Sequence, residues 1–302
     1  MRPPICLFTY NRLEHTRKTI EALLRNKNVS LHDLIIFSDA PDSNFNKYGV
    51  DQVRNYIKTI SGFRSVKIIF RKKNFGLSKS IITGVTQVLQ DYESIIVLED
   101  DMITSPYFLD YMNNGLKLFA RDERVVSIHA YVYPTFTVLP ETFFLYGADC
   151  WGWGTWRRGW KLFDADGKSL LRRLKKNDLI RKFDFNGSYL YSKMLINQIK
   201  GKNDSWAIRW YASAFLANKL TLYPGRSLVH NIGNDNSGTH CGATKKLDAV
   251  LSETPICFEG LNVSHSNLAY SAFEDFFKDS KLSFFRKFID YFKIFYELIN
   301  KC

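Results

Sequence analysis

Residues 95–101 read Ile-Ile-Val-Leu-Glu-Asp-Asp, so four apolar residues run directly into three carboxylates. A short continuous apolar run is typical of a strand that is buried on both faces of a sheet. Adjacent carboxylates repel one another, and a fold that gathers them usually supplies a cation nearby. Their hard oxygen atoms favour Mn2+ or Mg2+. The triplet alone leaves a second interpretation equally open, which is a strand that ends in a solvated acidic turn.

Three earlier segments show the same order of a buried strand followed by a helix. We predict strands over residues 5–9, 34–37 and 66–70, and helices over residues 14–25, 52–60 and 80–89. Strands that alternate with helices favour a parallel sheet, because each crossover needs a helix to return the chain to the same edge. The sequence therefore predicts an α/β fold with a Rossmann-like, mixed but mostly parallel sheet flanked by helices.

Polar residues follow these strands at their carboxyl ends, where a parallel sheet binds its ligands. Thr9, Tyr10, Asn11 and Arg12 follow the first strand, Asp39 follows the second, and Arg71 follows the third. Together with a metal, the cations would suit a diphosphate, and Asp39 could accept hydrogen bonds from a base or ribose. The simpler alternative for each cation is a solvated surface residue, and for Asp39 a helix cap or turn residue.

Composition and charge limit the class of function. Apolar residues make up 45% of the 302 residues and charged residues 24%, which is ordinary for a globular enzyme. The formal net charge of +12 favours an anionic partner, which could be nucleic acid, an acidic membrane or a phosphorylated substrate. No zinc-finger spacing or arginine-rich run supports nucleic acid. Five scattered cysteines and the lack of an apolar run of about 18 residues predict reduced thiols in a cytoplasmic protein without a transmembrane helix.

The second half of the chain is less regular. Four tryptophans between residues 151 and 160 precede a basic helical stretch at residues 169–202. Residues 225–242 are rich in Gly, Asn, Ser and His, which predicts a long loop suited to closing over a ligand. Residues 282–302 mix aromatic and basic residues, which predicts an amphipathic helix. This helix could lie on an anionic membrane or pack on protein, and the sequence favours neither.

Residues 95–101, continued by Ser105-Pro106-Tyr107-Phe108-Leu109-Asp110-Tyr111, resemble the Glu-Asp-Asp segment of inverting glycosyltransferases of the N-acetylglucosaminyltransferase I type. Residues 4–12 and 37–39 also resemble those enzymes and the wider GT-A glycosyltransferases, which include bacterial family-2-like enzymes of surface polysaccharide synthesis. The resemblance extends over about residues 4–160. It implies a GT-A fold and a metal-dependent, inverting transfer of a sugar from a nucleotide-diphosphate donor, expected to be a UDP-sugar, to a saccharide hydroxyl.

This resemblance implies roles for the residues at the strand ends. Asp101 corresponds to the direct ligand of the metal, expected to be Mn2+ or Mg2+, while Glu99 and Asp100 would contact the donor sugar or ribose. Arg12 and Asp39 fall where relatives hold the nucleotide, with Asp39 at the uracil. The other residues expected around the donor are Thr9, Tyr10, Asn11 and Arg71.

Residues 149–153 resemble the aromatic Gly-Trp segment that lines the donor and acceptor pocket of the family, which would make Trp153 a donor contact. The alternative for each tryptophan is a place in the core. An inverting transfer also needs a base to take the acceptor proton. The family pattern of a carboxylate followed by a tryptophan fits Asp204, and the fallback base is Asp149. His230 would add a ligand to the metal or diphosphate, as late histidines do in many GT-A enzymes.

Three parts of the chain are expected. Residues 1–125 would form a nucleotide-sugar-binding half, residues 126–270 the acceptor-binding and catalytic half of the same domain, and residues 271–302 an amphipathic helical tail. The expected partners are the nucleotide-sugar donor and a saccharide acceptor of a capsule, O-antigen or other surface glycan, which a lipid could carry, and not nucleic acid. The tail would hold the protein on the inner face of the cytoplasmic membrane. Two alternatives stay open, a sugar-phosphate nucleotidyltransferase and a non-catalytic carbohydrate-binding protein.

Overall fold

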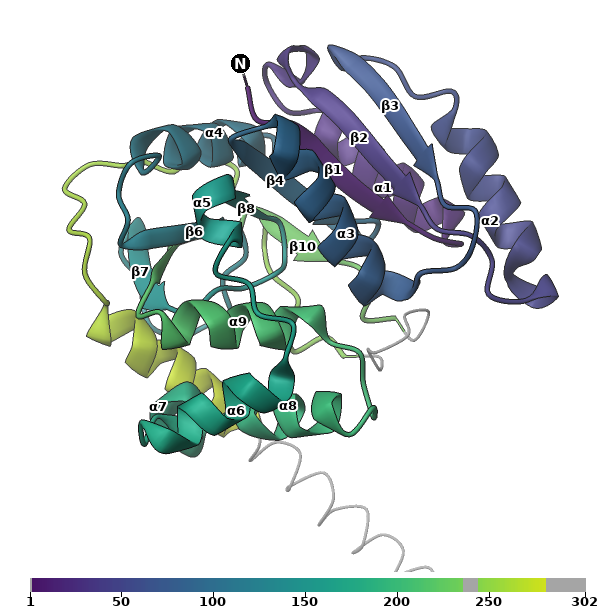
Figure 1. Cartoon of the computed structure of the whole chain (residues 1–302). Coiled ribbons are helices and arrows are strands. Elements are labelled where there is room, and N and C mark those ends of the chain that lie inside the picture. The colour runs from purple at the N-terminus through teal and green to yellow at the C-terminus, as the bar shows by residue number, and fades with distance from the viewer. Residues whose placement is uncertain (1, 236–243, 281–302) are drawn as a thin grey trace, which may run out of the picture.

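A sheet of eight strands forms the centre of the computed structural model, which describes residues 2–235 and 244–280 (Figure 1). Its strands are β1 (Ile5–Thr9), β2 (Asp33–Ser38), β3 (Ser65–Phe70), β4 (Ser94–Glu99), β6 (Val125–His129), β7 (Thr142–Tyr146), β8 (Trp153–Trp156) and β9 (Leu220–Pro224). Their order across the sheet is β3-β2-β1-β4-β8-β6-β9-β7. Strands β8 and β7 run antiparallel to their neighbours and the other pairs are parallel, which confirms the predicted mixed, mostly parallel α/β fold.

The crossover helices lie close to where the sequence predicts them. The described helices include α1 (Leu13–Leu24), α2 (Asn44–Ile57), α3 (Gly76–Asp91), α4 (Phe108–Leu118), α5 (Arg157–Trp160), α6 (Gly167–Lys176), α7 (Ile180–Phe183), α8 (Tyr191–Ile199) and α9 (Trp206–Leu216). Helix α2 begins earlier than predicted because Val50, Val53 and Ile57 form one buried stripe at helical spacing, and Val50 precedes the predicted start.

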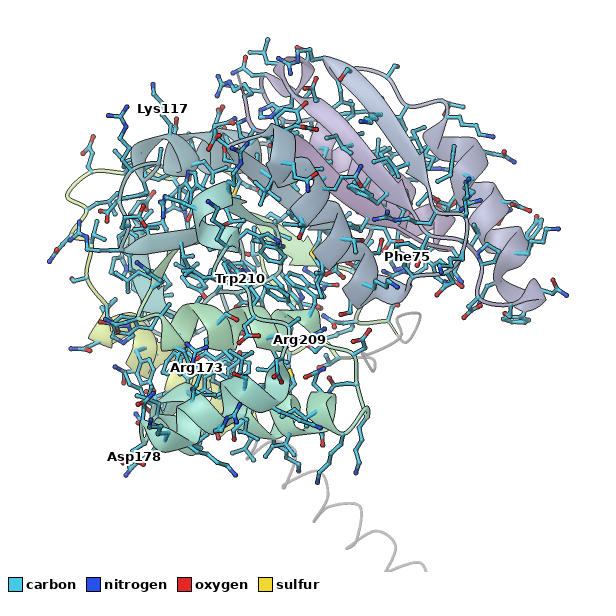
Figure 2. The ribbon with its side chains drawn as sticks, in the orientation of Figure 1. Phe75, Lys117, Arg173, Asp178, Arg209 and Trp210 are labelled. Atoms are coloured by element: carbon cyan, nitrogen blue, oxygen red, sulfur yellow. The ribbon has the colours of Figure 1, made fainter. Side chains whose placement is uncertain are left out.

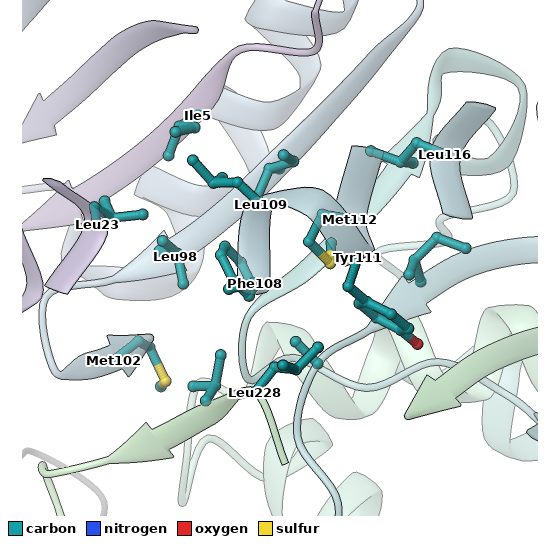
Figure 3. Close-up of a cluster of buried hydrophobic side chains, with 14 of the residues drawn as sticks. Ile5, Leu23, Leu98, Met102, Phe108, Leu109, Tyr111, Met112, Leu116 and Leu228 are labelled. Carbon is teal, nitrogen blue, oxygen red and sulfur yellow. The ribbon is translucent and has the colours of Figure 1, made fainter. Parts of the chain in front are cut away.

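Helices cover both faces of the sheet. Alternate residues of a strand point to opposite faces, so Leu7 of β1 packs with α1, α2 and α4, whereas Phe8 packs with α3 and α9. Figure 3 shows part of the first cluster, in which Leu98 of β4, Phe108 of α4 and Leu23 of α1 are all buried. Both faces of β1, β2 and β4 are therefore shielded from water, and the ends of these strands remain for ligands.

Short helices form a further layer beside α9. Helices α6, α7 and α8 and the helical residues 267–280 surround a third buried cluster that includes Phe183 and Phe273. The predicted basic stretch is not one helix, because Asp178 and Asn186 adopt left-handed backbone conformations between α6, α7 and α8. The predicted boundary at residue 270 falls inside the helical residues 267–280, since Phe273 is buried in the domain. The predicted helix at residues 282–302 lies outside the described residues.

A second, two-stranded sheet pairs distant parts of the chain. Strand β5 (Met102–Thr104), directly after the acidic run, pairs antiparallel with β10 (Val229–Asn231). The prediction of an uninterrupted loop over residues 225–242 is therefore wrong at β10, because the backbone there pairs with a strand instead of with water. Over residues 2–235 and 244–280, no helix is both long and apolar enough to cross a membrane.

Candidate active site

The carboxyl ends of four neighbouring strands lie together at one edge of the sheet. Thr9 at the end of β1 is in register with Ser38 at the end of β2, and Ser38 is in register with Phe70 at the end of β3. On the other side of β1, Phe8 is in register with Glu99 of β4. The sheet therefore brings residues 9–12, 39, 71 and 99–101 to the same edge, as the strand order predicts.

The carboxylates of residues 99–101 lie in a setting of low polarity. Burial, with the charges of Asp101 and Asp100, raises the pKa of Glu99 to about 8, although the Trp206 side chain donates a hydrogen bond to it. Burial also raises the pKa of Asp100 to about 6, against the opposing effect of the Arg12 charge. Carboxylates that resist ionisation in this way form a site that further positive charge would stabilise.

Arg12 supplies one positive charge to the acidic run. Its Nη2 donates to Asp101 Oδ2 at 2.7 Å and also donates to Asp100. Burial opposes the charge on the guanidinium, but the two carboxylates raise the pKa of Arg12 above its usual range. The second oxygen of each carboxylate, Asp100 Oδ2 and Asp101 Oδ1, is buried with no hydrogen-bond partner among the described residues.

These two carboxylate oxygens are the part of the site that fits a divalent cation. Mg2+ in enzymes is commonly bound through one or two carboxylates and completes its shell with substrate phosphates and water. Across residues 2–235 and 244–280, no three His, Cys, Asp or Glu side chains converge as metal ligands. The residues present therefore fit a cation that protein and diphosphate hold jointly, and they do not fit a cage built by protein alone.

Asp39 and Arg71 form the other end of this edge. Asp39 Oδ1 accepts hydrogen bonds from the N–H groups of Ala40 and Phe75, each at 2.9 Å, so this carboxylate also fixes the turn before α3. The Arg71 guanidinium lies over the Phe75 ring, 4.6 Å from its centroid, and donates to Thr83 at 3.0 Å. Burial lowers the pKa of Arg71. A cation and an aromatic ring beside a carboxylate can hold a planar base together with its ribose.

The remaining residues after β1 differ in what they contact. Tyr10 accepts a hydrogen bond from the Asp42 N–H at 3.2 Å, and Asn11 donates to Asn46 at 2.8 Å. These two residues therefore tie the end of β1 to the start of α2. The Thr9 hydroxyl is buried and has no hydrogen-bond partner in the part of the chain that the structure describes. The Thr9 hydroxyl can therefore form a hydrogen bond with a ligand at this edge.

A short segment that begins at the last residue of β10 lies against Asp101. We term residues 231–235 the strap. The Ile232 N–H donates to the Asp101 carbonyl at 2.9 Å, and the Gly233 N–H donates to the Asn231 side chain at 2.7 Å. At the end of the strap, Oδ2 of Asp235 lies 3.1 Å from Nε2 of His15 on α1. The strap therefore forms one wall of the acidic site.

The contacts that the structure gives for the side chain of His230, the predicted metal ligand, are not with the acidic run. His230 precedes the strap in β10, where alternate side chains point to opposite faces. Its Nδ1 accepts a hydrogen bond from the Ala249 N–H at 3.3 Å, and its ring lines a separate pocket with Tyr107. The alternation of the strand places Asn231, not His230, on the side of Asp101.

A cavity of about 870 Å³ lies beside the strap, since Asn234 is one of its lining residues. Asp149, Cys150 and Trp151 line it and lead into β8, which pairs antiparallel with β4, the strand that ends at Glu99. Aromatic rings suit the faces of sugar rings, because they combine a large apolar surface with a polar edge. The aromatic residues of the lining include Tyr131, Tyr133, Tyr191, Tyr211, Tyr223, Phe185, Phe273, Phe276 and Phe277.

Asp149 supplies a carboxylate to this cavity. Its Oδ1 accepts a hydrogen bond from the Cys150 N–H at 2.8 Å and lies 3.9 Å from Nε2 of the buried His129. Burial, and then the negative charge of Asp149, raises the pKa of Tyr131 and of Tyr223, so these hydroxyls stay neutral. Asp149 is the carboxylate among the described residues that line the cavity.

Asp204, the predicted base, lies just outside the cavity lining. Its neighbours Asn203 and Ser205 line the cavity, but the side chain of Asp204 is 66% exposed. Its Oδ1 lies 3.5 Å from Nη2 of Arg209. Arg209, on α9 (Figure 2), also donates to Ser78 of α3 at 2.6 Å. Of the two candidate bases, the structure thus brings Asp149 to the cavity and leaves Asp204 at its border.

Trp153, the predicted donor contact, lies in the core. Its side chain is 1% exposed and packs against Trp160, Trp206 and Trp210, with ring centroids between 5.3 and 6.1 Å away. Gly152 before it has a left-handed backbone conformation, with φ of 63°. Because of this turn, Trp153 packs in the core although residues 149–151 just before it line the cavity.

Sequence reasoning missed the strap as a part of the site. Asn234 is 9% exposed and lines the cavity, and its amide nitrogen has no hydrogen-bond partner among the described residues. The composition of this region indicated only a loop. The available signal was the apolar pair Leu228-Val229, which marks the strand that carries the strap to Asp101.

Residues 5–144 match the sequence model of a family described as "Glycosyl transferase family 2". The match covers just under half of the 302 residues of this chain. The glycosyltransferase match runs from β1 into β7, so it includes Arg12, Asp39 and the acidic run, whereas Asp149 and the strap follow it. The chain is thus a glycosyltransferase, and the matched part includes β1, β2, β3 and β4, whose ends form the edge with the acidic run.

Solved structures similar to this glycosyltransferase are distant. TarS of S. aureus is 14% identical, with 47% of this chain and 23% of TarS covered and a TM-score of 0.30. Glucosyl-3-phosphoglycerate synthase of Mycobacterium tuberculosis, in complex with Mn2+, UDP and glucosyl-3-phosphoglycerate, is 11% identical, with 59% and 67% covered and a TM-score of 0.32. UDP-glucose pyrophosphorylase complexed with UDP-glucose is 13% identical, with 74% and 90% covered and a TM-score of 0.36. The curated proteins contain no match. These neighbours assign neither a substrate nor a metal to this chain.

Proposed function

We propose that this glycosyltransferase moves a sugar from a nucleotide-diphosphate donor, a UDP-sugar, to a hydroxyl group of a saccharide acceptor with inversion at the anomeric carbon. The observation that supports this proposal most strongly is the pair of buried carboxylate oxygens, on Asp100 and Asp101, without partners among the described residues. Arg12 contacts both carboxylates. The strap connects them to the aromatic cavity of Asp149, because Gly233 lies against Asp101 and Asn234 lines the cavity. Two adjoining compartments of this chemistry suit a diphosphate donor and a sugar acceptor.

The donor compartment would hold its ligand through several residues. Asp101 and Asp100 would hold Mn2+ or Mg2+, and a bound cation would stabilise the charge that develops on the departing diphosphate. Arg12 would pair with phosphate oxygens, for which a guanidinium is well suited. Glu99 would accept hydrogen bonds from hydroxyls of the donor sugar or ribose. Asp39 would hold the base, and the choice of uracil rests on the resemblance at that position.

The acceptor compartment would supply the base. As the acceptor oxygen bonds to the anomeric carbon and the bond to the diphosphate breaks, a carboxylate must take the hydroxyl proton. We assign this role to Asp149 because it lies in the cavity, and we keep Asp204 as the alternative because its two neighbours line the same cavity. The cavity rings would stack on the acceptor and keep water from the donor.

The cellular role that fits this chemistry is the synthesis of a bacterial surface glycan, such as a capsule or O-antigen, on a lipid-linked acceptor at the inner face of the cytoplasmic membrane. The resemblance of the acidic run to enzymes of surface polysaccharide synthesis supports this role. The aromatic and basic sequence of residues 282–302 supports a contact with that membrane.

Calorimetric titration with UDP in the presence of Mn2+ or of a chelator tests the donor half of the proposal. We expect UDP to bind tightly only with Mn2+, and Asp101→Ala to abolish that dependence. A panel of nucleotide sugars should then contain one whose hydrolysis requires the metal. UDP binding that is equally tight with Mn2+ and with the chelator would contradict the proposal. Saccharide binding without any nucleotide binding would favour a carbohydrate-binding protein.

A further inference from the structure

The basic charge of the chain is concentrated in one layer of helices. Residues 167–202 carry ten Lys and Arg side chains against two Asp side chains, which is a net charge of +8 out of +12 for the whole chain. These residues form α6, α7 and α8, which contact one another at the end of the molecule away from β3 (Figure 1). The donor compartment, with Arg12 and Arg71, draws its positive charge from other elements, so it does not account for this layer.

The cations of this layer face solvent. The ten exposed side chains are Lys168, Arg172, Arg173, Lys175, Lys176, Arg181, Lys182, Lys193, Lys200 and Lys202. Figure 2 shows Arg173 and Asp178 in this layer and Phe75 at the other end, beside the donor edge. The second acid of the layer, Asp184, is buried and accepts a hydrogen bond from Ser192 at 2.6 Å, so it does not offset the surface charge. The layer therefore presents a strongly positive surface.

Apolar side chains stand among these cations. Tyr189 and Leu190, in the turn before α8, are 36% and 45% exposed. Both line the acceptor cavity together with Lys193, so the cavity opens into the basic layer. Ser280, the last described residue before the aromatic and basic tail, lines the same cavity. Exposed apolar residues among Lys and Arg are typical of a surface that rests in the headgroup layer of an anionic membrane.

We propose that α6, α7 and α8, with Tyr189 and Leu190, dock on an anionic lipid surface and turn the acceptor cavity toward the headgroups. Charge complementarity selects this occupant, because a layer with ten exposed cations and the exposed Tyr189 and Leu190 matches an extended anionic surface that has an apolar interior. The docking itself does not depend on the proposed function. The benefit to catalysis does depend on it, since an acceptor carried by a lipid would then reach Asp149 from the membrane side.

Co-sedimentation of the full-length chain with lipid vesicles tests the proposal. The layer variant replaces Arg172, Lys175 and Lys176 of α6 with Gln, which keeps helix propensity and lowers the charge by three. The matched control replaces three exposed lysines of the donor half, Lys27, Lys47 and Lys67, with Gln and lowers the charge equally. Each cation near an anionic leaflet raises the binding constant about fivefold, so the loss of three cations should make the layer variant bind phosphatidylglycerol vesicles on the order of 100-fold more weakly than the wild type.

The matched control should bind these vesicles within about threefold of the wild type, and phosphatidylcholine vesicles should bind none of the three proteins. Equal loss in both variants would overturn the proposal, because net charge and not the layer would then govern binding. Wild-type binding by the layer variant would also overturn it, since residues 281–302 are present in every protein and would then suffice. Circular dichroism of each variant shows whether a loss of vesicle binding is due to unfolding. Metal-dependent UDP binding of each variant shows whether the donor site is intact, so a failure of the proposed function can be told from a failure of docking.

Discussion

Gly233 lies so close to Asp101 that no larger residue fits between them. A Cβ added to Gly233 would fall 2.2 Å from Asp101 Oδ2 and 2.9 Å from its Cγ, which is far inside van der Waals contact. The strap therefore approaches the proposed metal ligand through the one residue that has no side chain. This approach can be broken by a single methyl group.

Gly233→Ala is expected to weaken Mn2+-dependent UDP binding by about tenfold to 100-fold, because the methyl must displace the Asp101 carboxylate or the strap. Calorimetric titration of UDP in saturating Mn2+ measures the effect. His230→Ala is the matched control from the residue just before the strap, and it should bind as the wild type does. An equal loss of Mn2+-dependent UDP binding in His230→Ala would support a role of that histidine at the metal site.

Asp149→Asn should lower kcat for sugar transfer by about 100-fold or more, the contribution typical of a general base, and should leave UDP binding unchanged. Asp204→Asn should retain most of the transfer rate, since its side chain is exposed outside the cavity lining. Radiolabelled transfer assays on both variants make the comparison. The reverse ranking would assign the proton transfer to Asp204.

Trp153→Ala should destabilise the fold by about 3–5 kcal/mol, because it removes a buried ring from a cluster of four tryptophans. Trp151→Ala, at the cavity wall, should unfold at nearly the wild-type urea concentration and instead raise KM for the acceptor. Urea denaturation followed by circular dichroism provides the first measurement and steady-state kinetics the second. A stable Trp153→Ala protein with impaired donor binding would restore the predicted donor contact.

Asp33→Asn should lower the thermal midpoint by several degrees at neutral pH. Asp33 is buried, and hydrogen bonds from Arg64, Ser65 and Tyr92 hold its pKa well below the usual range against the effect of burial. A lowered pKa in the folded state means that ionised Asp33 stabilises the fold above its unfolded pKa of about 3.9, and that this stabilisation is lost as the pH falls below that value.

The difference between Asp33→Asn and the wild type should therefore begin to shrink as the pH falls below about 4 and should continue to shrink toward the lowest pH of the thermal melts. Asp51→Asn, an exposed position on α2, provides the control and should follow the wild type throughout. A difference that stays constant down to the lowest pH would mean that the lost packing of Asp33, and not its charge, causes the destabilisation.

The donor edge could be predicted because consecutive strands of a parallel sheet end on the same side whatever the details of their loops. Arg12, Asp39 and Asp101 therefore meet as the strand order requires. The strap could not be predicted in this way, since its contact with Asp101 follows from the pairing of β10 with β5, two segments far apart in the chain. Nothing local in residues 225–242 specifies that partner.

Trp153 shows a second limit of sequence reasoning. An aromatic residue next to glycine fits a ligand pocket and a core equally well by composition. The orientation was decided by Gly152, whose left-handed backbone turns the chain between the cavity wall and β8. Such a turn depends on how the sheet accepts β8 between β4 and β6, which is a property of the assembled fold.

Two consecutive residues of the strap face different ligands in the proposed reaction. Gly233 touches the acidic run, and the next residue, Asn234, lines the acceptor cavity. The two substrates are thus separated by a partition of a single backbone strand. A movement of this strand on one side would change the shape of the other, so binding of the donor should alter the affinity for the acceptor.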